Sequence, residues 1–509
     1  MDQPIISVNN EQNIEQIDLT TKYLMEHIDK VLIVFCNPIS GNREGKIFLD
    51  LAQHYLTKEK YKLIDFQYLL TLQKYEPIKA VFFELINQED KTKGEKLLKY
   101  CAERCKINKE AGLPENFQKI KTLISGGDGT ILSMVDDFVK KGIDINYCIF
   151  GHVPLGTGND LSNSLGFSDH VDISEYDIND LYNILLNYHQ AKYGKVDIWK
   201  IDFQLDPIDG EILTNTKNGK FPLKDENGNI IKRYIRSFIN YVSLGYDARV
   251  GYNIDPKRST GRNLNKCIYF IEGAKKMFCR KTNSIQKFID TVTIYDSQNN
   301  TINQESFFSD NEEEVNATIN KDPLTTSTQN LDYQKPKFKF MSKDSFKANK
   351  IQSKCLVLEG KPCSIVFQNV VNYMSGVRDI WGNGKHRLSV GLKNMTNVEK
   401  LKYTEKLNNM ANLKQCLDDE MLEIFTFDNG LETGFEKVIG GLCKKIYHGR
   451  GPIEVKFLPS PKYIKEDKEH RIYFNLDGEY FHIVKPTLLR IEINRDYCGG
   501  QLPFLVKRV

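Results

Sequence analysis

Two short glycine-rich segments decide the fold: Ser125-Gly126-Gly127-Asp128-Gly129-Thr130 and Pro154-Leu155-Gly156-Thr157-Gly158-Asn159-Asp160-Leu161. Each follows a run typical of a buried strand, over residues 121–124 and 147–150, and precedes a run typical of a helix. Both segments are therefore predicted to be turns at the carboxyl ends of strands, which is where an open α/β sheet binds its ligands.

The residue types in these turns suit a phosphate ligand. Glycine lacks a Cβ, so its backbone N–H group can approach a phosphate, and the helix that follows presents its positive end. Asp128 lies between glycines, where it can reach a hydrated Mg²⁺. We interpret the pair as a cradle for a triphosphate, and tight turns that use glycine only for its positive φ are the alternative.

Neither turn has the pattern of the common nucleotide-binding loops. G-x-x-x-x-G-K-S/T and G-x-G-x-x-G are absent at both positions. The sequence therefore argues against a P-loop NTPase and against a Rossmann dehydrogenase.

Composition bounds the class of protein. The chain has 509 residues, 40% of them hydrophobic, and a formal charge of +3, so we expect two or three globular domains and no nucleic-acid partner. The 11 cysteines include no C-x-x-C pair, which favours reduced thiols of a cytoplasmic protein. Since neither a signal peptide nor a spanning helix is evident, any lipid substrate would be reached by peripheral association with a membrane.

Periodicity predicts the organisation of the first part of the chain. Residues 1–30 form a polar lead, and strands alternate with helices over residues 31–195. A third strand-to-turn junction follows residues 31–35 at Asn37. This pattern predicts an α/β domain with a doubly wound, mostly parallel sheet that binds a nucleotide.

The second part, residues 196–500, has short alternating or β-rich runs and predicts an all-β, sandwich-like domain with one helical stretch near residues 266–278. Residues 205–232 and 297–350 lack a hydrophobic period, so we interpret them as loop or disordered insertions. Residues 501–509 are expected to be a C-terminal tail.

The order of the motifs resembles that of the diacylglycerol kinases. The resemblance covers roughly residues 31–495, and the layout is similar to that of plant-like members that lack cysteine-rich zinc modules. Besides the two glycine-rich segments, the matching blocks are Asn37-Pro38…Ser40-Gly41, residues 240–248, Asn265-Lys266…Tyr269, Asn369…Gly376…Trp381-Gly382, Asp418-Asp419…Leu422-Glu423 and Asp477-Gly478-Glu479…Pro486.

The resemblance implies a lipid kinase that uses ATP and Mg²⁺ to convert diacylglycerol in membranes to phosphatidic acid. Positioning and charge neutralisation supply most of the rate in phosphoryl transfer, so glycine-rich turns with Mg²⁺ are adequate. Asp128 would orient Mg²⁺ or the phosphates as a catalytic residue, and Asp160 is equally interpreted as a helix cap. The residues implied to contact the nucleotide are Asn37, Ser125, Gly126, Gly127, Gly129, Thr130, Gly156, Thr157, Gly158, Asn159 and Asp160.

Asp419 matches the family position proposed for the general base, with Glu423 as a nearby carboxylate. A solvated turn before a strand is the alternative for both. The chain departs from the family at Glu420, where relatives usually have glycine, and at Met374, in a stretch that is glycine-rich in relatives. If the turn requires a positive φ, Glu420 is expected to be strained.

Residues 335–350 are a candidate contact for anionic lipid. Each lysine near such a lipid contributes about 1 kcal/mol, and aromatic rings enter the interface. The alternative is an edge strand over residues 337–340 with outward lysines. The segment interleaves Lys335, Lys337, Lys339, Lys343, Lys347 and Lys350 with Phe338, Phe340, Met341 and Phe346.

Other functions share parts of this pattern. Sphingosine and ceramide kinases have a similar first turn and two-domain plan, although residues 154–161 and Trp381-Gly382 fit the diacylglycerol branch better. NAD kinases share G-G-D-G-T, but the chain shows no counterpart of their second, asparagine-rich turn. An inactive lipid-binding scaffold is the non-enzymatic alternative.

Overall fold

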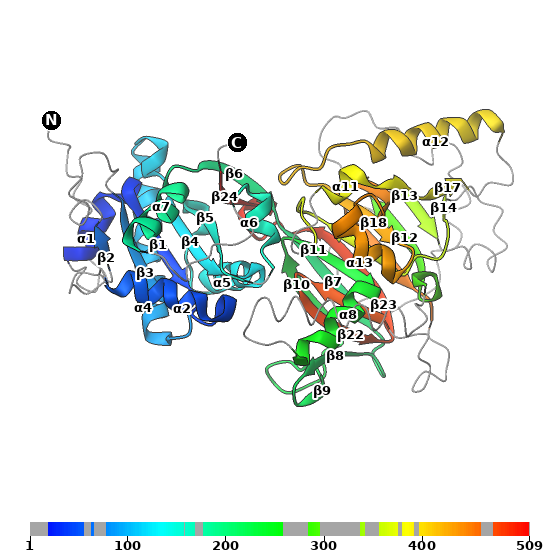
Figure 1. Ribbon diagram of the computed structural model, residues 1–509, viewed down its shortest axis with the longest axis horizontal. Helices are drawn as coiled ribbons and strands as arrows, with labels where there is room; N and C mark the ends of the chain where they lie inside the picture. The colour runs from blue at the N-terminus through cyan, green and yellow to red at the C-terminus, as the bar shows by residue number, and fades with distance from the viewer. Residues whose placement is uncertain are drawn as a thin grey trace.

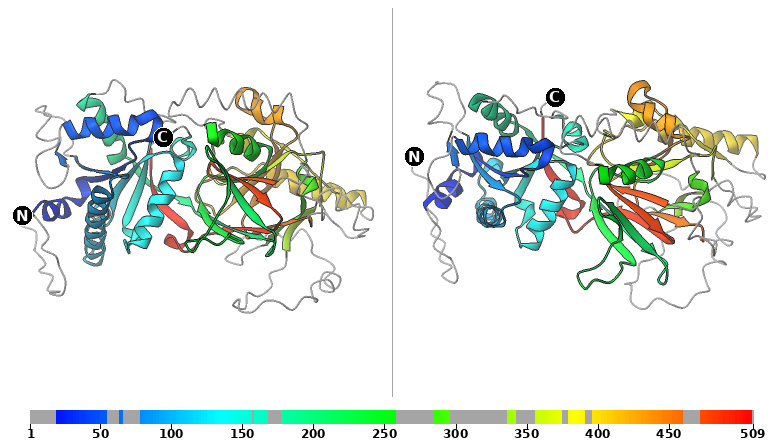
Figure 2. Two further views of the ribbon diagram at one scale, coloured as in Figure 1. Left: turned by 90° about the horizontal axis from the view of Figure 1, so that it is seen from below. Right: turned by 60° about the horizontal axis from the view of Figure 1, so that its bottom comes forward.

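The computed structural model describes residues 19–54, 63–65, 78–156, 158–167, 177–257, 284–295, 336–341, 356–374, 379–390, 396–459 and 472–507. An α/β region and a β-rich region lie side by side along the long axis (Figures 1 and 2). The helix between residues 266 and 278 that the sequence predicts, and the block that begins at Asn265, fall outside the described residues.

The α/β region contains a seven-stranded sheet in which β1, β3, β4 and β5 pair in parallel. The chain winds from β1 to β3 on one side and returns to β4 on the other, so the order reverses between β1 and β4. Ligands bind at such a reversal in doubly wound sheets. Across the sheet the strands are β2 (Leu63–Asp65), β3 (Lys79–Glu84), β1 (Val31–Cys36), β4 (Ile120–Gly126), β5 (Cys148–Pro154), β24 (Gln501–Val506) and β6 (Lys192–Asp197).

Helices cover both faces of this sheet. Phe35 of β1 packs against Phe138 of α5, with ring centroids 5.1 Å apart. Gly94 of α4 also lies against the ring of Phe35. On the opposite face, Phe48 of α2 packs against Phe82 at 5.7 Å. The helices of this region are α1 (Leu19–Glu26), α2 (Ser40–His54), α4 (Gln88–Glu110), α5 (Asp128–Lys140), α6 (Asp160–Ser164) and α7 (Ile178–His189).

The expected C-terminal tail is instead a strand. β24 lies between β5 and β6, parallel to the first and antiparallel to the second, and Figure 1 shows it among the strands of the α/β region. Leu502, Phe504 and Leu505 are fully buried there. The apolar residues near the end of the chain therefore close the first sheet after the chain has passed through the second region.

The β-rich region contains an eight-stranded and a nine-stranded sheet. The first has the order β10 (Arg233–Phe238), β7 (Trp199–Leu205), β23 (Pro486–Ile493), β20 (Ile453–Phe457), β12 (Ile289–Tyr295), β13 (Pro336–Met341), β14 (Leu356–Leu358) and β17 (Leu388–Val390). The second has the order β16 (Lys385–His386), β19 (Lys444–Gly449), β18 (Leu422–Phe427), β15 (Ser364–Gln368), β11 (Tyr241–Gly245), β21 (Ile472–Leu476), β22 (Glu479–Val484), β8 (Glu211–Thr216) and β9 (Gly219–Pro222).

The two sheets share one hydrophobic core. Phe203 of β7 meets Phe474 of β21 edge to face, with centroids 5.1 Å apart. The prediction of an all-β region is wrong in one respect, because apolar residues on the other side of the nine-stranded sheet pack against helices. These helices are α8 (Tyr246–Ile254), α11 (Ile380–Asn383) and α13 (Gly430–Ile439), and α12 (Asn397–Ala411) packs against β16, β17 and β19.

Two further expectations need correction. Residues 205–232 hold the hairpin of β8 and β9, because Ile212 reaches the shared core and anchors it. β13 lies between β12 and β14, so residues 337–340 are not at a sheet edge. Phe340 is 1% exposed within the core and does not enter a membrane interface.

Helices long and apolar enough to cross a bilayer are absent from the part of the chain that the structure describes.

Candidate functional site

Three turns meet at the carboxyl ends of β1, β4 and β5. The Asn37 N–H donates to the Ser125 carbonyl at 3.0 Å. The N–H groups of Leu155 and Gly156 donate to the Gly126 carbonyl at 3.1 and 3.0 Å. A Cβ on Gly41 would lie 2.0 Å from the Leu155 carbonyl oxygen, so the first turn also presses against the third. The three strand ends that the sequence singles out thus form one surface.

Close approach explains two of the glycines. A Cβ on Gly156 would lie 2.4 Å from the Cα of Gly127, and a Cβ on Gly126 would lie 2.6 Å from Thr130 Oγ1. The alternative of glycines used only for a positive φ does not hold for Gly126, Gly127, Gly129 or Gly156, because none of these four has one. Gly129 differs, since a Cβ there would meet nothing within 4 Å. Packing does not require glycine at that position, and the open space beside it is available to a ligand.

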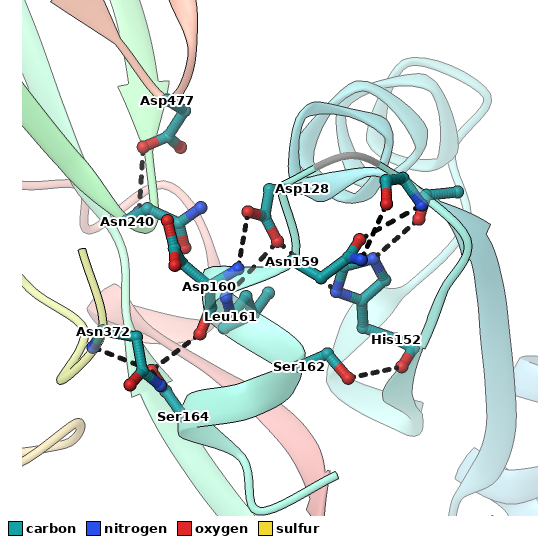
Figure 3. A network of polar contacts seen from close by, with 12 residues as sticks. Asp128, His152, Asn159, Asp160, Leu161, Ser162, Ser164, Asn240, Asn372 and Asp477 are labelled. Atoms are coloured by element: carbon teal, nitrogen blue, oxygen red, sulfur yellow. Dashed lines mark hydrogen bonds and ion pairs between the residues drawn. The ribbon is translucent and has the colours of Figure 1, made fainter. Parts of the chain in front are cut away.

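Asp128 joins the second and third turns. Its Oδ2 accepts from the Asp160 N–H at 2.9 Å and its Oδ1 accepts from the Leu161 N–H at 3.3 Å, as Figure 3 shows. The N-cap residue of α6 is Asn159, and the carboxylate of Asp128, from α5, accepts the first N–H groups of this helix. The alternative in which Asp160 is the N-cap is wrong. Asp160 is instead the first residue of α6.

Asn159 holds the third turn closed. Its Oδ1 accepts from the Gly156 N–H at 3.2 Å, and its Nδ2 donates to the Gly156 carbonyl at 2.9 Å. The side chain is buried. Of the neighbouring residues proposed from the sequence, Gly158 lies beside Gly127, and Thr157 falls outside the described residues.

Acidic groups gather around Asp128. Burial is the main cause that raises its pKa well above the ordinary value, and the charges of Asp160 and Asp477 raise it further. Hydrogen bonds from the backbone of Asp160 and Leu161 oppose the rise. Like charges in a low-dielectric site repel, so a cation placed among them would be strongly favoured.

Asp477 comes from the turn between β21 and β22, in the β-rich region. Its carboxylate accepts from the N–H groups of Ile239, Asn240 and Tyr241 at 2.8 to 2.9 Å. Burial nevertheless raises the pKa of Asp477 to about 6. Sequence reasoning quoted this motif without assigning a role, because Asp-Gly is an ordinary hairpin turn. We refer to Asp128, Asp160, Asp477 and Asn240 as the turn cluster.

His152 lies beneath the second turn, and sequence reasoning missed it. Its Nε2 is 3.1 Å from the Gly126 carbonyl oxygen and its Nδ1 is 3.6 Å from Asp128 Oδ1. The ring is fully buried, which lowers the pKa of His152 to about 4. Its place in a buried strand gave no local signal, since an isolated histidine in such a run is most simply a core residue.

The β-rich region also contacts α6 directly. Ser164 Oγ lies 3.3 Å from the Asn372 N and 3.0 Å from Asn372 Nδ2, and its hydroxyl donates to the Asp160 carbonyl at 2.8 Å. The helix whose first N–H groups donate to Asp128 is thus held from both regions of the chain (Figure 3).

Asp419 and Glu423 belong to a different group. Gln415 Nε2 donates to Glu423 Oε2 at 2.6 Å. His448 lies between the two carboxylates, 3.8 Å from Asp419 Oδ2 and 3.7 Å from Glu423 Oε1. Asp197 accepts from the Glu420 N–H at 2.6 Å. We refer to Asp197, Gln415, Asp419, Glu423 and His448 as the junction cluster.

Burial dominates the electrostatics of the junction cluster. It raises the pKa of Glu423 well above the ordinary value, with Asp419 as the next cause, and it raises the pKa of Asp197 to about 7. Glu423 is a fully buried residue of β18, so a solvated turn does not describe it, whereas the Asp419 side chain is 24% exposed. In the described part of the chain, no hydrogen bond or ion pair joins Asp419 or Glu423 to Asp128.

Both departures from the family pattern lie at residues with a positive φ, which sequence reasoning considered for Glu420 alone. Glu420 has a φ of 59° and Met374 a φ of 49°, a conformation that disfavours any residue other than glycine. The backbone strain at Glu420 is offset by Arg495, whose Nη1 and Nη2 donate to the Glu420 carboxylate at 2.7 and 2.9 Å.

Groups of three or more histidine, cysteine, aspartate or glutamate side chains arranged for a metal do not occur in the described segments. Mg²⁺ commonly binds one or two carboxylates together with substrate phosphates and water, and the turn cluster fits that pattern.

Comparison with known proteins matches both regions of the chain. Residues 31–180 match the diacylglycerol kinase catalytic domain and residues 237–480 match the diacylglycerol kinase accessory domain. Diacylglycerol kinase 7 of Arabidopsis thaliana is 27% identical over 262 residues, which is 47% of this chain and 47% of that protein.

Two further relatives of this chain are also named diacylglycerol kinases. Diacylglycerol kinase 3 of Arabidopsis thaliana is 26% identical over 49% of each chain. Diacylglycerol kinase iota of Homo sapiens is 23% identical over 52% of this chain and 20% of that protein. The matched part of this chain thus spans half or less of the length of these curated relatives.

Proposed function

Because the chain belongs to the diacylglycerol kinase family, we propose that it transfers the γ-phosphoryl group of ATP to diacylglycerol, giving phosphatidic acid and ADP. The observation that carries the proposal is the meeting of the two glycine-rich turns at Asp128, which faces Asp477 of the other region. Phosphoryl transfer depends on positioning and charge neutralisation, and this arrangement supplies both.

The first turn of α5 is the proposed phosphate cradle. The N–H groups at the start of a helix have no partner within it and carry a partial positive charge. The open space beside Gly129 leaves room for phosphate oxygens. Ser125, Gly126, Gly127 and Thr130 form the wall of this cradle. In the first and third turns, Asn37, Gly156, Gly158, Asn159 and Asp160 shape the remainder of the nucleotide site.

Asp128 is the proposed protein contact of Mg²⁺. Burial first, and then the charges of Asp160 and Asp477, raise its pKa, and a bound cation would offset both effects. When bound, Mg²⁺ would neutralise negative charge on the triphosphate. The N–H groups of Asp160 and Leu161 donate to the Asp128 carboxylate and hold it in place, and the His152 ring lies beside it.

A carboxylate is proposed to accept the proton of the attacking hydroxyl. As the lipid oxygen bonds to the γ-phosphorus, the bond from that phosphorus to the bridging oxygen breaks and ADP leaves with the electron pair. Asp419 is the base suggested by the family resemblance. Asp477 is a second candidate, favoured because its charge acts on Asp128 and its pKa is about 6, near the working pH.

The regions have proposed roles as domains. Residues 31–195, joined by β24, would bind the nucleotide, and residues 196–500 would present the lipid. We propose that the protein meets diacylglycerol at a membrane surface. The lysines of residues 335–350 stay proposed contacts for anionic lipid, without Phe340, which is buried.

Transfer of labelled phosphate from γ-labelled ATP tests the function. Diacylglycerol, sphingosine and ceramide are offered in mixed micelles with Mg²⁺, and NAD in solution. We expect label in phosphatidic acid. Label in a sphingolipid instead would replace the acceptor but keep the nucleotide site, and label in no acceptor would favour an inactive scaffold.

A further inference from the structure

We propose that Asn240 of the β-rich region supplies, through its side-chain Oδ1, an oxygen ligand to the divalent cation that accompanies the triphosphate. The cation would then be held from both regions of the chain. This inference rests on the proposed function and adds a ligand that comes from outside the glycine-rich turns.

The first observation is an unsatisfied atom. Asn240 is 2% exposed, and its Oδ1 has no hydrogen-bond partner. Leaving a buried polar atom unpaired costs about 1–3 kcal/mol, so native proteins rarely do so without a ligand or a functional reason.

The second observation is that the backbone of Asn240 is fixed. Its N–H donates to Asp477 Oδ1 at 2.9 Å. Its carbonyl accepts from the N–H groups of Asn369 and Val370 at 2.9 and 3.4 Å. Figure 3 shows the side chain between Asp477 and Asp160, on the side toward Asp128. Three hydrogen bonds of the Asn240 backbone thus fix the position of the residue, and none of them uses Oδ1.

The third observation is the chemistry of the surroundings. Asp160 and Asp477 both raise the pKa of Asp128 by their charge. The Oδ1 of Asn240 and the carboxylate oxygens around it are acceptor atoms, which are the ligands that Mg²⁺ prefers. A hydroxyl or a water would satisfy one oxygen and leave the charge in place, whereas a divalent cation satisfies the oxygen and reduces the repulsion.

Binding of Mn²⁺ with ATP tests the proposal without requiring catalysis. Titration calorimetry would compare ATP with Mn²⁺ and ATP with EDTA, and electron paramagnetic resonance would follow free Mn²⁺. We expect Asn240→Leu, which keeps the volume but removes the oxygen, to weaken binding of Mn²⁺ with ATP by about tenfold or more. ATP in EDTA should bind the variant and the wild type alike.

Asn240→Asp is the informative partner variant, because it keeps an oxygen and removes the amide donor. We expect it to retain or strengthen Mn²⁺ binding. Asn215→Ala is a matched control, since the Nδ2 of Asn215 donates to the Tyr252 carbonyl at 2.7 Å on β8, away from the turn cluster. Circular dichroism and urea midpoints show whether each variant is folded.

The outcomes separate this inference from the function on which it rests. Equal weakening with Mn²⁺ and with EDTA in Asn240→Leu, or a loss of Mn²⁺ binding in Asn240→Asp, would overturn the inference alone. A wild-type chain that bound ATP in neither condition would overturn both the proposed function and the inference. Mn²⁺-dependent ATP binding that required the Asn240 oxygen, without transfer to any lipid, would overturn only the function.

Discussion

The turn cluster and the junction cluster are both acidic and buried, yet they are completed in different ways. In the junction cluster, protein groups accompany the carboxylates: Gln415 donates to Glu423, His448 lies within 3.8 Å of both Asp419 and Glu423, and Gln501 Nε2 donates to Asp197 at 2.8 Å. In the turn cluster, backbone N–H groups donate to Asp128 and Asp477, and no side chain of opposite charge is paired with Asp128 in the part of the chain that the structure describes. Both clusters hold buried polar atoms without a hydrogen-bond partner, Asn240 Oδ1 in the turn cluster and Gln415 Oε1, Glu423 Oε1 and both ring nitrogens of His448 in the junction cluster.

The difference indicates which cluster meets a ligand. Buried charge is tolerated where the protein itself supplies partners, and such a group stabilises or specifies the fold. Buried carboxylates that lie close together and raise each other's pKa, as Asp160 and Asp477 do for Asp128 in addition to its burial, are typical of functional sites. We therefore expect substitutions in the turn cluster to affect nucleotide binding and turnover, and substitutions in the junction cluster to affect the free energy of unfolding.

The largest effect is expected for Asp128→Asn, which removes the charge proposed to face Mg²⁺. Turnover of diacylglycerol should fall by about 10³-fold, the scale of losing a central electrostatic contact, while the amide oxygen can still accept one N–H of α6. Steady-state kinetics on mixed micelles measure the loss. Glu89→Gln on the exposed start of α4 is the charge-matched control, and an Asp128→Asn protein with full turnover would refute the site.

The two candidate bases form the next test. Asp477→Asn should lower kcat by about 10²-fold or more, the range for general bases, while Asp419→Asn should change it only a few-fold. Both variants are assayed at saturating ATP, with urea unfolding to detect structural loss. A reversed ranking would return the base to Asp419 and place catalysis in the junction cluster.

Gln415→Leu should test the structural character of the junction cluster. Gln415 Nε2 donates to Glu423 Oε2 and to the Val370 carbonyl, so its loss leaves buried acceptors unpaired. The free energy of unfolding should fall by about 2 kcal/mol, and the KM for ATP should not change. If the variant had normal stability and a raised KM for ATP, the junction cluster would take part in nucleotide binding, and the proposed difference between the two clusters would be wrong.

Asp197 should make stability depend on pH. Its pKa is raised from 3.8 to about 7 in the folded chain, so the folded state binds the proton more tightly than the unfolded state. Its contribution is fully present below about pH 4 and is lost as the pH rises to 7. Between pH 6 and pH 8 the loss is about 1.4 kcal/mol.

Urea midpoints measured across that pH range check the prediction. The groups that face Asp197 are Glu420, Gln501 and Asp419. Asp197→Asn should remove this slope from the variant's own curve of stability against pH, so that the difference between wild type and variant changes by about 1.4 kcal/mol over the range. A profile that keeps the wild-type slope in this variant would assign the pH dependence to another group.

The smallest effect is expected for Glu420→Gly. Glycine relieves the φ of 59°, which costs a non-glycine residue about 1 kcal/mol, but the variant loses the partly exposed ion pair with Arg495, which contributes less than about 1 kcal/mol. Thermal or urea unfolding should show a small net stabilisation. Destabilisation by more than 1 kcal/mol would mean that the Arg495 pair dominates.

Local signals predicted much of the fold and of the nucleotide site. The apolar runs before Asn37, Ser125 and Leu155 predicted β1, β4 and β5, and glycine with polar residues at their ends predicted the turns. The sequence also singled out Glu420 as strained on the condition that its turn has a positive φ, and the structure meets that condition.

Other features depended on partners far away along the chain. β24 looked like a tail because a short terminal run has no partner in its own neighbourhood, yet it pairs with β5 and β6. Phe340 looked like an exposed membrane residue because its lysine neighbours are polar, yet β12 and β14 flank its strand.

The sequence by itself determined the family, the parallel sheet of the first region and the three turns at its strand ends, because hydrophobic period and glycine placement are local properties of the chain. Only the tertiary structure decided that Asp128 accepts the first N–H groups of α6, that Asp477 and Asn240 approach it, and that Asp419 lies in another cluster. Long-range strand pairing sets which side chains share a dielectric environment, and that environment decides which carboxylates need a partner from outside.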